Sequence, residues 1–358
     1  MVRLERGVRA HFRVIRVNRW GLALAILLIL ALLLLPGDKL GLRPVLGEKA
    51  DRVQPGVTVG SRDFSGYTEA EAKQALTQMA SMYRDKPVSA YEAKDPDGYA
   101  YIIPEVNGYE LDVEGTWTRL LAARPNTRVE PATRLVTPSK KMGDFPKAII
   151  RHGNPAKKEV GLLINVDWGE DLLGGMLETL AKRGAKATFF VSGKWADKNR
   201  ELMTKIVAGG HEVASHGHVL TEDGPEGLAR RGALRADIEK SVQVIQAATG
   251  LPVKYYAPHK SQVNPAILKT ADELKLRTVL YSLDTRDWMP STSVANIMET
   301  FHKAMAGDLI LLHPKPNTAK ALDQAVQHLQ AKGLTPVTLS ELLSPDREGP
   351  AAVGGEHH

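Results

Sequence analysis

Residues 159 to 339 alternate between short apolar segments and longer segments in which apolar residues recur with helical spacing. This alternation constrains the fold more than any other feature of the sequence. The apolar segments predict strands at 160–166, 187–191, 212–215, 253–256, 278–282, 309–312 and 336–339. The segments between them predict helices at 171–183, 194–207, 226–248, 264–274, 294–305 and 318–331. Strands that alternate with helices indicate a parallel α/β sheet or a shortened α/β barrel.

Residues able to form a site follow several of these strands at their carboxyl ends, where the loops of a parallel α/β fold converge. They are Asp167, His216, His218, Pro258, Asp284, Asp287 and His313. Each has an ordinary structural explanation when taken alone, such as a helix cap for the first aspartate or a hydrogen-bonded structural role for a histidine. Together at one mouth, they predict a functional site.

Four stretches of this region carry a family resemblance: KATFFVSG at 186–193, GHEVASH at 210–216, DTRDW at 284–288 and GDLILLHP at 307–314. With them, residues 158–345 resemble the polysaccharide deacetylase family, which is built on the NodB homology domain. The resemblance implies a distorted (β/α) barrel in which an Asp, His, His triad holds a divalent metal such as zinc. It implies a hydrolase that releases acetate from an N-acetyl sugar, using an Asp as general base and a His as general acid.

Carried over residue by residue, the catalytic positions of the family are present. The resemblance makes Asp167 the general base and His313 the general acid, with Asp287 tuning the histidine. It also implies contacts with the substrate at Trp168, Trp288, Pro258 and Leu312.

The metal ligands of the family carry over only in part. Trp168 stands where the family has its metal-binding Asp, and Leu220 stands where it has its second metal-binding His. His216 matches the first His, while Ala257 replaces the Arg that orients the base. Catalytic zinc sites ordinarily present three protein ligands, so one matched ligand does not hold a metal firmly.

Two functions stay open on these residues. The first is a deacetylase of wall glycan, with Asp167 as base, His313 as acid and His216 as metal ligand. A relocated metal site is a variant of it: residues two apart on a strand face the same way, so His216 and His218 can join Asp167 around the metal, and the base role then passes to Glu170, Asp171 or Asp223. The second is a catalytically inactive relative that keeps the groove to bind wall glycan or a partner, with Trp168 as a stacking platform for a sugar ring.

The N-terminal segment predicts a membrane anchor. Residues 1–19 carry six arginines and one glutamate, a local charge of +5 out of a formal net charge of +6, and residues 20–36 carry no charged side chain. A cleaved signal peptide is the alternative, but the run lacks the small-residue exit that cleavage requires. The arginines predict a cytoplasmic N-terminus, with the main domains outside the cell or facing the spore cortex. Since the rest of the chain is nearly neutral, no nucleic-acid partner is expected.

Between this anchor and the α/β region, residues 37–54 predict a linker, 55–137 a small α+β domain and 138–157 a second linker. In the small domain, Thr68 and Glu71 predict a capping box that opens a helix, and the turn pair Asn107-Gly108 lies between two predicted strands. This domain is similar to peptidoglycan-binding domains that precede wall-acting domains in Gram-positive surface proteins. A spacer without a ligand is the alternative. Residues 346–358 predict a flexible tail.

The whole chain is similar to a subgroup of membrane-anchored, sporulation-associated deacetylase-like proteins of endospore formers. In that subgroup an INV-x-WG run also replaces the double-Asp motif, which favours a role without catalysis. The chain has no cysteine, which excludes disulfides, thiolate catalysis and Cys-based metal sites.

Overall fold

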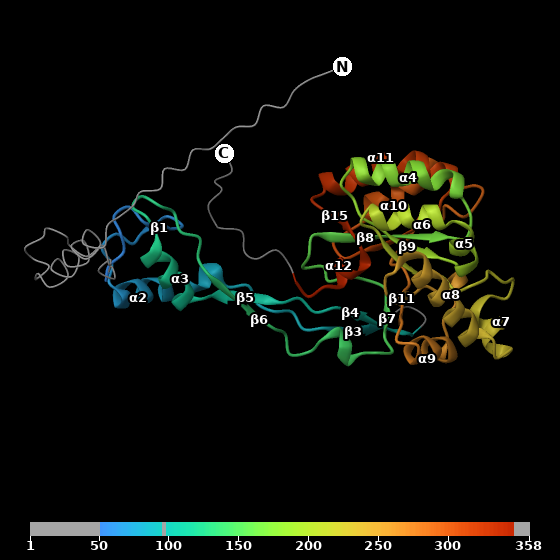
Figure 1. Cartoon of the computed structure of the whole chain (residues 1–358), viewed down its shortest axis with the longest axis horizontal. Helices are drawn as coiled ribbons and strands as arrows, with labels where there is room; N and C mark the ends of the chain where they lie inside the picture. The colour runs from blue at the N-terminus through green and yellow to red at the C-terminus, as the bar shows by residue number, and fades with distance from the viewer. Residues whose placement is uncertain (1–50, 95–97, 347–358) are drawn as a thin grey trace, which may run out of the picture.

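The computed structural model describes residues 51–94 and 98–346. The predicted cytoplasmic arm, the membrane anchor, most of the first linker and the tail from residue 347 lie outside these residues. Figure 1 shows a small N-terminal unit joined by a narrow ribbon of strands to a larger α/β unit. In the part of the chain that the structure describes, no helix has the length and apolar character needed to cross a bilayer.

The N-terminal unit contains two helices that pack against each other, α2 (Glu69–Met79) and α3 (Val113–Ala122). α2 begins at the predicted capping box: the Thr68 backbone N–H donates to the Glu71 carboxylate at 2.8 Å, and the Glu71 N–H donates to the Thr68 hydroxyl at 3.4 Å. The buried faces of both helices join one hydrophobic cluster with β1 (Thr58–Val59). This unit therefore has a core of its own.

The strands predicted on either side of Asn107-Gly108 form, but they do not pair with each other. β4 (Ala100–Ile103) lies between β3 (Tyr91–Lys94) and β7 (Ile149–Ile150), whereas β5 (Gly108–Leu111) pairs with β6 (Thr133–Val136). The Asn107 backbone N–H donates to the Pro345 carbonyl at 2.7 Å, and its side chain donates to Asp346 at 2.9 Å. The turn prediction is wrong because Asn107 binds the C-terminal segment instead of closing a hairpin.

The later part of residues 138–157 is packed, so the prediction of a linker does not hold there, whereas residues 139–147 are mostly exposed. The segment contains a 3₁₀ turn at Met142–Asp144 and the strand β7, in which Ile149 and Ile150 are fully buried. Ile150 forms a parallel bridge to Val279 of the α/β unit. The Pro, Gly and Lys content of the segment hid this two-residue apolar strand, because two residues are too few to show a period.

The alternation of strands and helices in the α/β unit is confirmed. All the strand pairs are parallel, in the order β12-β11-β10-β9-β8-β14-β13, and β15 also pairs with β8. The strands are β8 (Glu159–Val166), β9 (Thr188–Val191), β10 (Glu212–Ser215), β11 (Tyr255–Tyr256), β12 (Arg277–Thr278), β13 (Leu283–Asp284), β14 (Leu309–Leu312) and β15 (Thr335–Val337).

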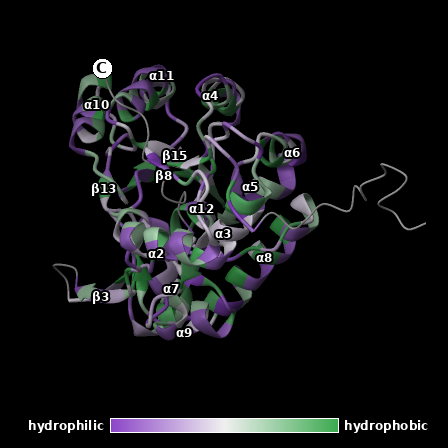
Figure 2. Cartoon of the chain, turned by 90° about the vertical axis from the view of Figure 1, so that its left-hand side faces the viewer, coloured by the Kyte–Doolittle hydropathy of each residue, from purple (hydrophilic) through white to green (hydrophobic). Residues whose placement is uncertain are grey.

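Helices cover the outside of this sheet. They are α4 (Glu170–Lys182), α5 (Gly193–Lys198), α6 (Arg200–Ala208), α7 (Gly224–Arg230), α8 (Leu234–Thr249), α9 (Pro265–Glu273), α10 (Val294–Lys303) and α11 (Pro316–Ala331). The last helix, α12 (Leu339–Leu343), packs against the opposite, inner face of the sheet. Figure 2 shows hydrophilic and hydrophobic residues on each of α4, α8 and α11, as expected of helices with one face on a core. Two predicted helices are each split, at the non-helical Asn199 and at Gly232, whose φ is +69°.

The sheet curls until its two edges approach each other. β12 and β13 lie at opposite ends of the pairing order, yet only residues 279–282 separate them. Four residues span at most about 15 Å, which a flat sheet of seven strands would exceed. Between the edges, the Leu280 backbone N–H donates to the Ile150 carbonyl at 2.8 Å. The result is a curled half-barrel whose seam is occupied by β7.

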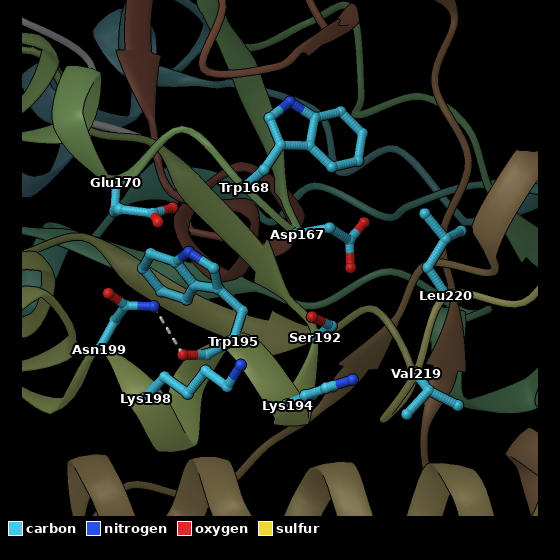
Figure 3. Close-up of a pocket in the computed structure, with 10 residues that line it drawn as sticks. All are labelled: Asp167, Trp168, Glu170, Ser192, Lys194, Trp195, Lys198, Asn199, Val219 and Leu220. Atoms are coloured by element: carbon cyan, nitrogen blue, oxygen red, sulfur yellow. Dashed lines mark hydrogen bonds between the residues drawn. The ribbon is translucent and has the colours of Figure 1, made fainter.

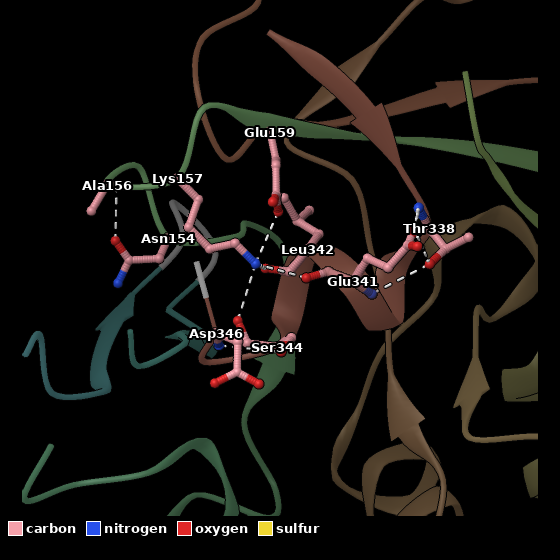
Figure 4. Close-up of polar contacts among 9 residues, drawn as sticks. All are labelled: Asn154, Ala156, Lys157, Glu159, Thr338, Glu341, Leu342, Ser344 and Asp346. Carbon is pink, nitrogen blue, oxygen red and sulfur yellow. Dashed lines mark hydrogen bonds and ion pairs between the residues drawn. The ribbon is translucent and has the colours of Figure 1, made fainter. Parts of the chain in front are cut away.

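A buried lysine fixes the last helix to the first strand of the half-barrel (Figure 4). The Lys157 ammonium donates to the carbonyls of Glu341 at 2.7 Å, Leu342 at 3.3 Å and Ser344 at 3.1 Å, where α12 ends. It also forms an ion pair with Glu159 at 2.9 Å, in a direction that does not make a hydrogen bond. Lys157 therefore caps the carbonyl end of α12.

Candidate functional site

A cavity of about 500 Å³ opens at the carboxyl ends of the strands. Six residues that the sequence predicted for the site line it: Asp167, Trp168, His216, Asp284, Trp288 and His313. The structure adds Asn165, Leu220, His259, Lys260, Ser261, Tyr281 and Leu311. They come from the carboxyl ends of β8, β13 and β14 and from the loops after β8, β10, β11, β12, β13 and β14, as expected where the βα loops of a parallel fold converge.

His313 follows β14 and is held by a buried carboxylate. Asp287 accepts from the His313 ring Nδ1–H at 2.8 Å, from the His313 backbone N–H at 2.7 Å and from the Thr318 hydroxyl at 2.6 Å. The side chain of Asp287 is fully buried, so these three donors are its partners in place of water. The carboxylate fixes the histidine with Nδ1 protonated, which leaves Nε2 to exchange a proton with a group in the cavity.

Trp168 lies directly after Asp167 and forms a wall of the cavity. Its ring is parallel to that of His313, with a 1° angle between the planes and 6.1 Å between the centroids. The Lys315 ammonium lies 5.0 Å from the indole centroid. Gly169 follows with φ +84°, and a Cβ there would come within 2.5 Å of the Pro314 carbonyl oxygen. The loop after β8 therefore requires glycine next to Trp168.

Asp167, His216 and His259 converge on the floor of the cavity. The Asp167 carboxylate lies 3.8 Å from His216 Nε2 and 3.6 Å from His259 Nδ1, and the two imidazole centroids are 3.9 Å apart. The His216 ring donates from Nδ1 to the Ala257 carbonyl at 2.6 Å. This hydrogen bond directs the lone pair of Nε2 toward the carboxylate.

Burial keeps both imidazoles neutral. It lowers the pKa of His216, although the Asp167 carboxylate opposes the change. Burial, with smaller contributions from His216 and Lys260, lowers the pKa of His259 to about 2. Neutral imidazoles have lone pairs available for a hydrogen-bond donor or a metal ion.

These three side chains fit a divalent metal ion. One ligand atom from each lies within 4.8 Å of the other two. Asp167 Oδ1 and His259 Nε2 are buried without a hydrogen-bond partner among the residues that the structure describes. A carboxylate with two neutral imidazoles is a common ligand set for zinc and other first-row divalent metals. Held there, such an ion would act as a Lewis acid at the cavity floor.

Three residues predicted for the site lie elsewhere. His218 does not join the cluster, because Gly217 has φ +86° and ends the strand alternation that would have aligned it with His216. Its ring lies against Gly193 instead. Pro258 is buried behind the cavity lining, and Leu312 packs into the core beneath the helices.

The neighbours of these two residues take the predicted places. Leu311 lines the cavity in place of Leu312, because successive residues of an extended strand face opposite ways. His259, the first residue of the 3₁₀ turn His259–Ser261, lines it in place of Pro258. His259 was missed, although it follows the strand β11 at its carboxyl end, as His216 follows β10. That position was the signal that could have found it.

A second cavity, of about 350 Å³, lies beside the first and shares Asp167, Trp168 and Leu220 with it (Figure 3). Its remaining lining comes mainly from α5 and includes the exposed Lys194 and the buried Trp195. The indole N–H groups of Trp168 and Trp195 are both buried without an acceptor among the described residues. A ligand that filled both cavities would meet indole rings and unpaired donors.

Comparisons with known proteins agree with this fold. The sequence profile of the family described as polysaccharide deacetylase matches residues 152–279. An uncharacterized protein of Bacillus subtilis, YlxY, is 30% identical over 278 residues, which cover 76% of this chain and 84% of that protein. A peptidoglycan-N-acetylglucosamine deacetylase of Bacillus cereus is 30% identical over 176 residues, which cover 47% of this chain and 80% of the enzyme.

A solved structure is similar over most of the chain. It is the wild-type form of a protein from Bacillus anthracis described as a CE4 family pseudoenzyme, with 28% identity, a TM-score of 0.63 and coverage of 77% of this chain and 95% of that one. A mutant of the same protein, described as having restored enzymatic activity, matches with 27% identity and a TM-score of 0.63, over 77% of this chain and 98% of the mutant.

Proposed function

The chain belongs to the polysaccharide deacetylase family, and from that premise we propose that it binds an N-acetylated wall glycan of the peptidoglycan type without deacetylating it. The observation that carries the proposal is Trp168, an indole ring at the position where the family resemblance expects a metal-binding Asp. A side chain that cannot ligate a metal but can stack on a sugar replaces a ligand at the centre of the site.

The shape and chemistry of the cavity support a saccharide ligand. Trp168, Tyr281 and the half-exposed Trp288 offer aromatic faces, on which the C–H face of a sugar ring can pack. Asp284 and His313 lie among them and can hydrogen-bond hydroxyl or acetamido groups. Apolar walls with a few convergent polar groups are the usual composition of a small-ligand site.

A second replaced ligand position supports the absence of deacetylation. Leu220 stands where the resemblance expects the third ligand, and its side chain is exposed at the cavity mouth. Ala257 stands in place of the Arg that would orient Asp167 and offers that carboxylate no donor. The solved Bacillus anthracis structure is itself described as a pseudoenzyme, which is consistent with an inactive branch of the family.

The test measures binding and turnover on the same protein. The full-length chain in detergent is titrated with chitooligosaccharides and soluble peptidoglycan fragments, and acetate release is assayed alongside. We expect saturable binding, no acetate above a buffer blank, and a loss of about 1 to 3 kcal/mol of binding free energy for Trp168→Ala. Tyr91→Ala is the matched control, since this aromatic residue is exposed on β3, away from the cavity. Equal glycan affinity of Trp168→Ala and the wild type would show that Trp168 is not a stacking platform for the sugar.

A gain-of-function variant tests why catalysis is absent. Replacing Trp168 by Asp together with Leu220 by His supplies the two ligands that the resemblance finds missing. We expect this double variant to release acetate where the wild type does not, by analogy with the Bacillus anthracis mutant described as having restored activity. Acetate release by the wild type at the level of the double variant would contradict the proposal.

One observation favours the alternative, a working deacetylase. The hydrogen-bonded pair of Asp287 and His313 is complete, as a general acid would require. If the wild type turns over, Asp167→Asn and His313→Ala should each abolish acetate release while leaving glycan binding within a few-fold. Thr318→Val, which removes one donor to the same carboxylate, should reduce the rate less.

We further propose that the chain is a single-pass membrane protein with its N-terminus in the cytoplasm and its main domains outside, in the setting of endospore formation. The support is the arginine-rich arm before the uncharged run at 20–36 and the wall-directed activity of the Bacillus cereus relative. Protease added to intact cells should degrade the α/β unit, and carbonate washing should not release the protein. Release by carbonate would contradict the anchor.

A further inference from the structure

One carboxylate and two imidazole rings face one another at the floor of the cavity. His216 uses Nδ1–H to reach the Ala257 carbonyl at 2.6 Å, so its Nε2 meets the Asp167 carboxylate with a lone pair. His259 turns Nδ1 toward the same carboxylate oxygen. Both imidazole residues are nearly fully buried, so bulk water does not separate the three groups. Asp167 Oδ1 and His259 Nε2 are buried without a hydrogen-bond partner among the described residues, and buried polar atoms ordinarily have one.

The separations are too long for direct hydrogen bonds and suit an ion between the groups. The carboxylate oxygen lies 3.8 Å from one imidazole nitrogen and 3.6 Å from the other, beyond the range of an N–H···O bond. Two ligands that each lie about 2.0 to 2.1 Å from a tetrahedral zinc are about 3.3 Å apart. Side-chain movements of a few tenths of an ångström would therefore close the site around a metal.

We propose that Asp167, His216 and His259 bind one divalent first-row transition-metal ion, with zinc as the reference ion. In this site His259 supplies the ligand that neither Leu220 nor His218 supplies. Two imidazoles and one carboxylate favour zinc, cobalt, nickel or iron over magnesium and calcium, which prefer oxygen ligands. The His216 hydrogen bond to a backbone carbonyl is the outer contact that usually orients a metal-binding histidine.

This site goes beyond the proposed function and is independent of it. All three side chains line the cavity of about 500 Å³, so an ion held by them is accessible to a bound glycan. Asp167 becomes a ligand and can no longer act as the general base. A chain that binds metal here would therefore still lack deacetylation by the family route, which separates metal occupancy from activity.

Metal binding is measured without glycan and without an activity assay. The full-length chain in detergent is stripped with a chelator, titrated with Co²⁺ and Zn²⁺, and followed by elemental analysis, cobalt d–d absorption and melting temperature. We expect about one equivalent of tightly bound metal, a tetrahedral or five-coordinate cobalt spectrum, and a melting temperature raised by the metal. No thiolate bands should appear, since the chain has no cysteine.

Matched histidine variants locate the site. His259→Phe keeps a ring of similar size and should weaken metal binding roughly 100-fold or more, whereas His218→Gln, in the loop next to the site, should bind as the wild type does. Adventitious binding by His357 and His358 is the same in every variant, so the comparison isolates the cluster.

Two results would overturn the site. One is a wild-type chain that retains no metal after dialysis, which needs no variant to interpret and holds even if His259→Phe fails to fold. The other is unchanged affinity in a folded His259→Phe protein. Either would leave a bound water as the bridge between the three side chains. Neither would affect the proposed glycan binding, because the titration with chitooligosaccharides can be repeated on chelator-treated protein.

Discussion

Replacement of the buried Lys157 by Met should destabilise the α/β unit strongly. The ammonium group is the partner of three carbonyls at the end of α12 and of the Glu159 carboxylate. Met fills much of the same volume but donates no hydrogen bond. A net contribution of about 1.5 kcal/mol per hydrogen bond to a charged group gives about 4.5 kcal/mol for three, and breaking a buried ion pair costs a similar 3 to 5 kcal/mol.

Both figures estimate the cost of removing the same ammonium group and are not added, so the expected loss is about 4 kcal/mol of unfolding free energy. For a domain of this size each kcal/mol shifts the melting temperature by about 2 to 4 °C. The melting temperature of the α/β unit should therefore fall by about 10 °C in calorimetry of the full-length chain. Lys158→Met is the matched control, because the neighbouring lysine is exposed, and its transition should move by less than 2 °C. A loss below about 1 kcal/mol for Lys157→Met, or equal losses for both variants, would refute the reasoning.

Three further perturbations have expected outcomes. Burial lowers the pKa of His211 to about 4, and its Nδ1 accepts from the Ala187 N–H. Protonation of His211 therefore favours the unfolded chain. The free energy of unfolding should fall by about 2 kcal/mol as the pH drops from 6.5 to 4. His211→Asn keeps the acceptor and should flatten that dependence in urea titrations at several pH values; an unchanged slope would assign it to other groups. Asp287→Ala leaves three buried donors without a partner and should cost about 3 to 5 kcal/mol by urea denaturation, a prediction that a loss under 1 kcal/mol would contradict. Gly169→Ala should cost at least about 2 kcal/mol, from φ +84° and the approach of its Cβ to the next loop, and wild-type stability in thermal melts would count against that strain.

The architecture of the α/β unit could be predicted because its signals are local and repeated. Each apolar strand between amphipathic helices adds the same information, so errors at single boundaries did not change the fold class. The segment around Ile149 could not be predicted in this way. Its two buried residues pair with strands about 50 and 130 residues away, and no period within the segment records those partners.

For the candidate site, the sequence could indicate which strand ends meet but not the direction of each side chain. Asp167, His216 and His313 were placed correctly, because each directly follows the regular strand that positions it. His218 was misplaced by a single left-handed glycine, and Leu312 by one step of the strand alternation. A one-residue difference reverses the face of a strand, so site residues are predicted less securely than strands.

The position of the strand β7 in the seam affects where a fragment of this chain can be cut and still fold. The match to the family profile begins at residue 152, two residues after Ile150. A fragment cut at that boundary would expose the backbone of Val279 and Leu280 and the apolar groups that β7 covers, an open edge of the kind that promotes aggregation. The segment that matches the family profile is thus shorter than the segment that folds, and a soluble fragment that contains the α/β unit should begin before residue 138.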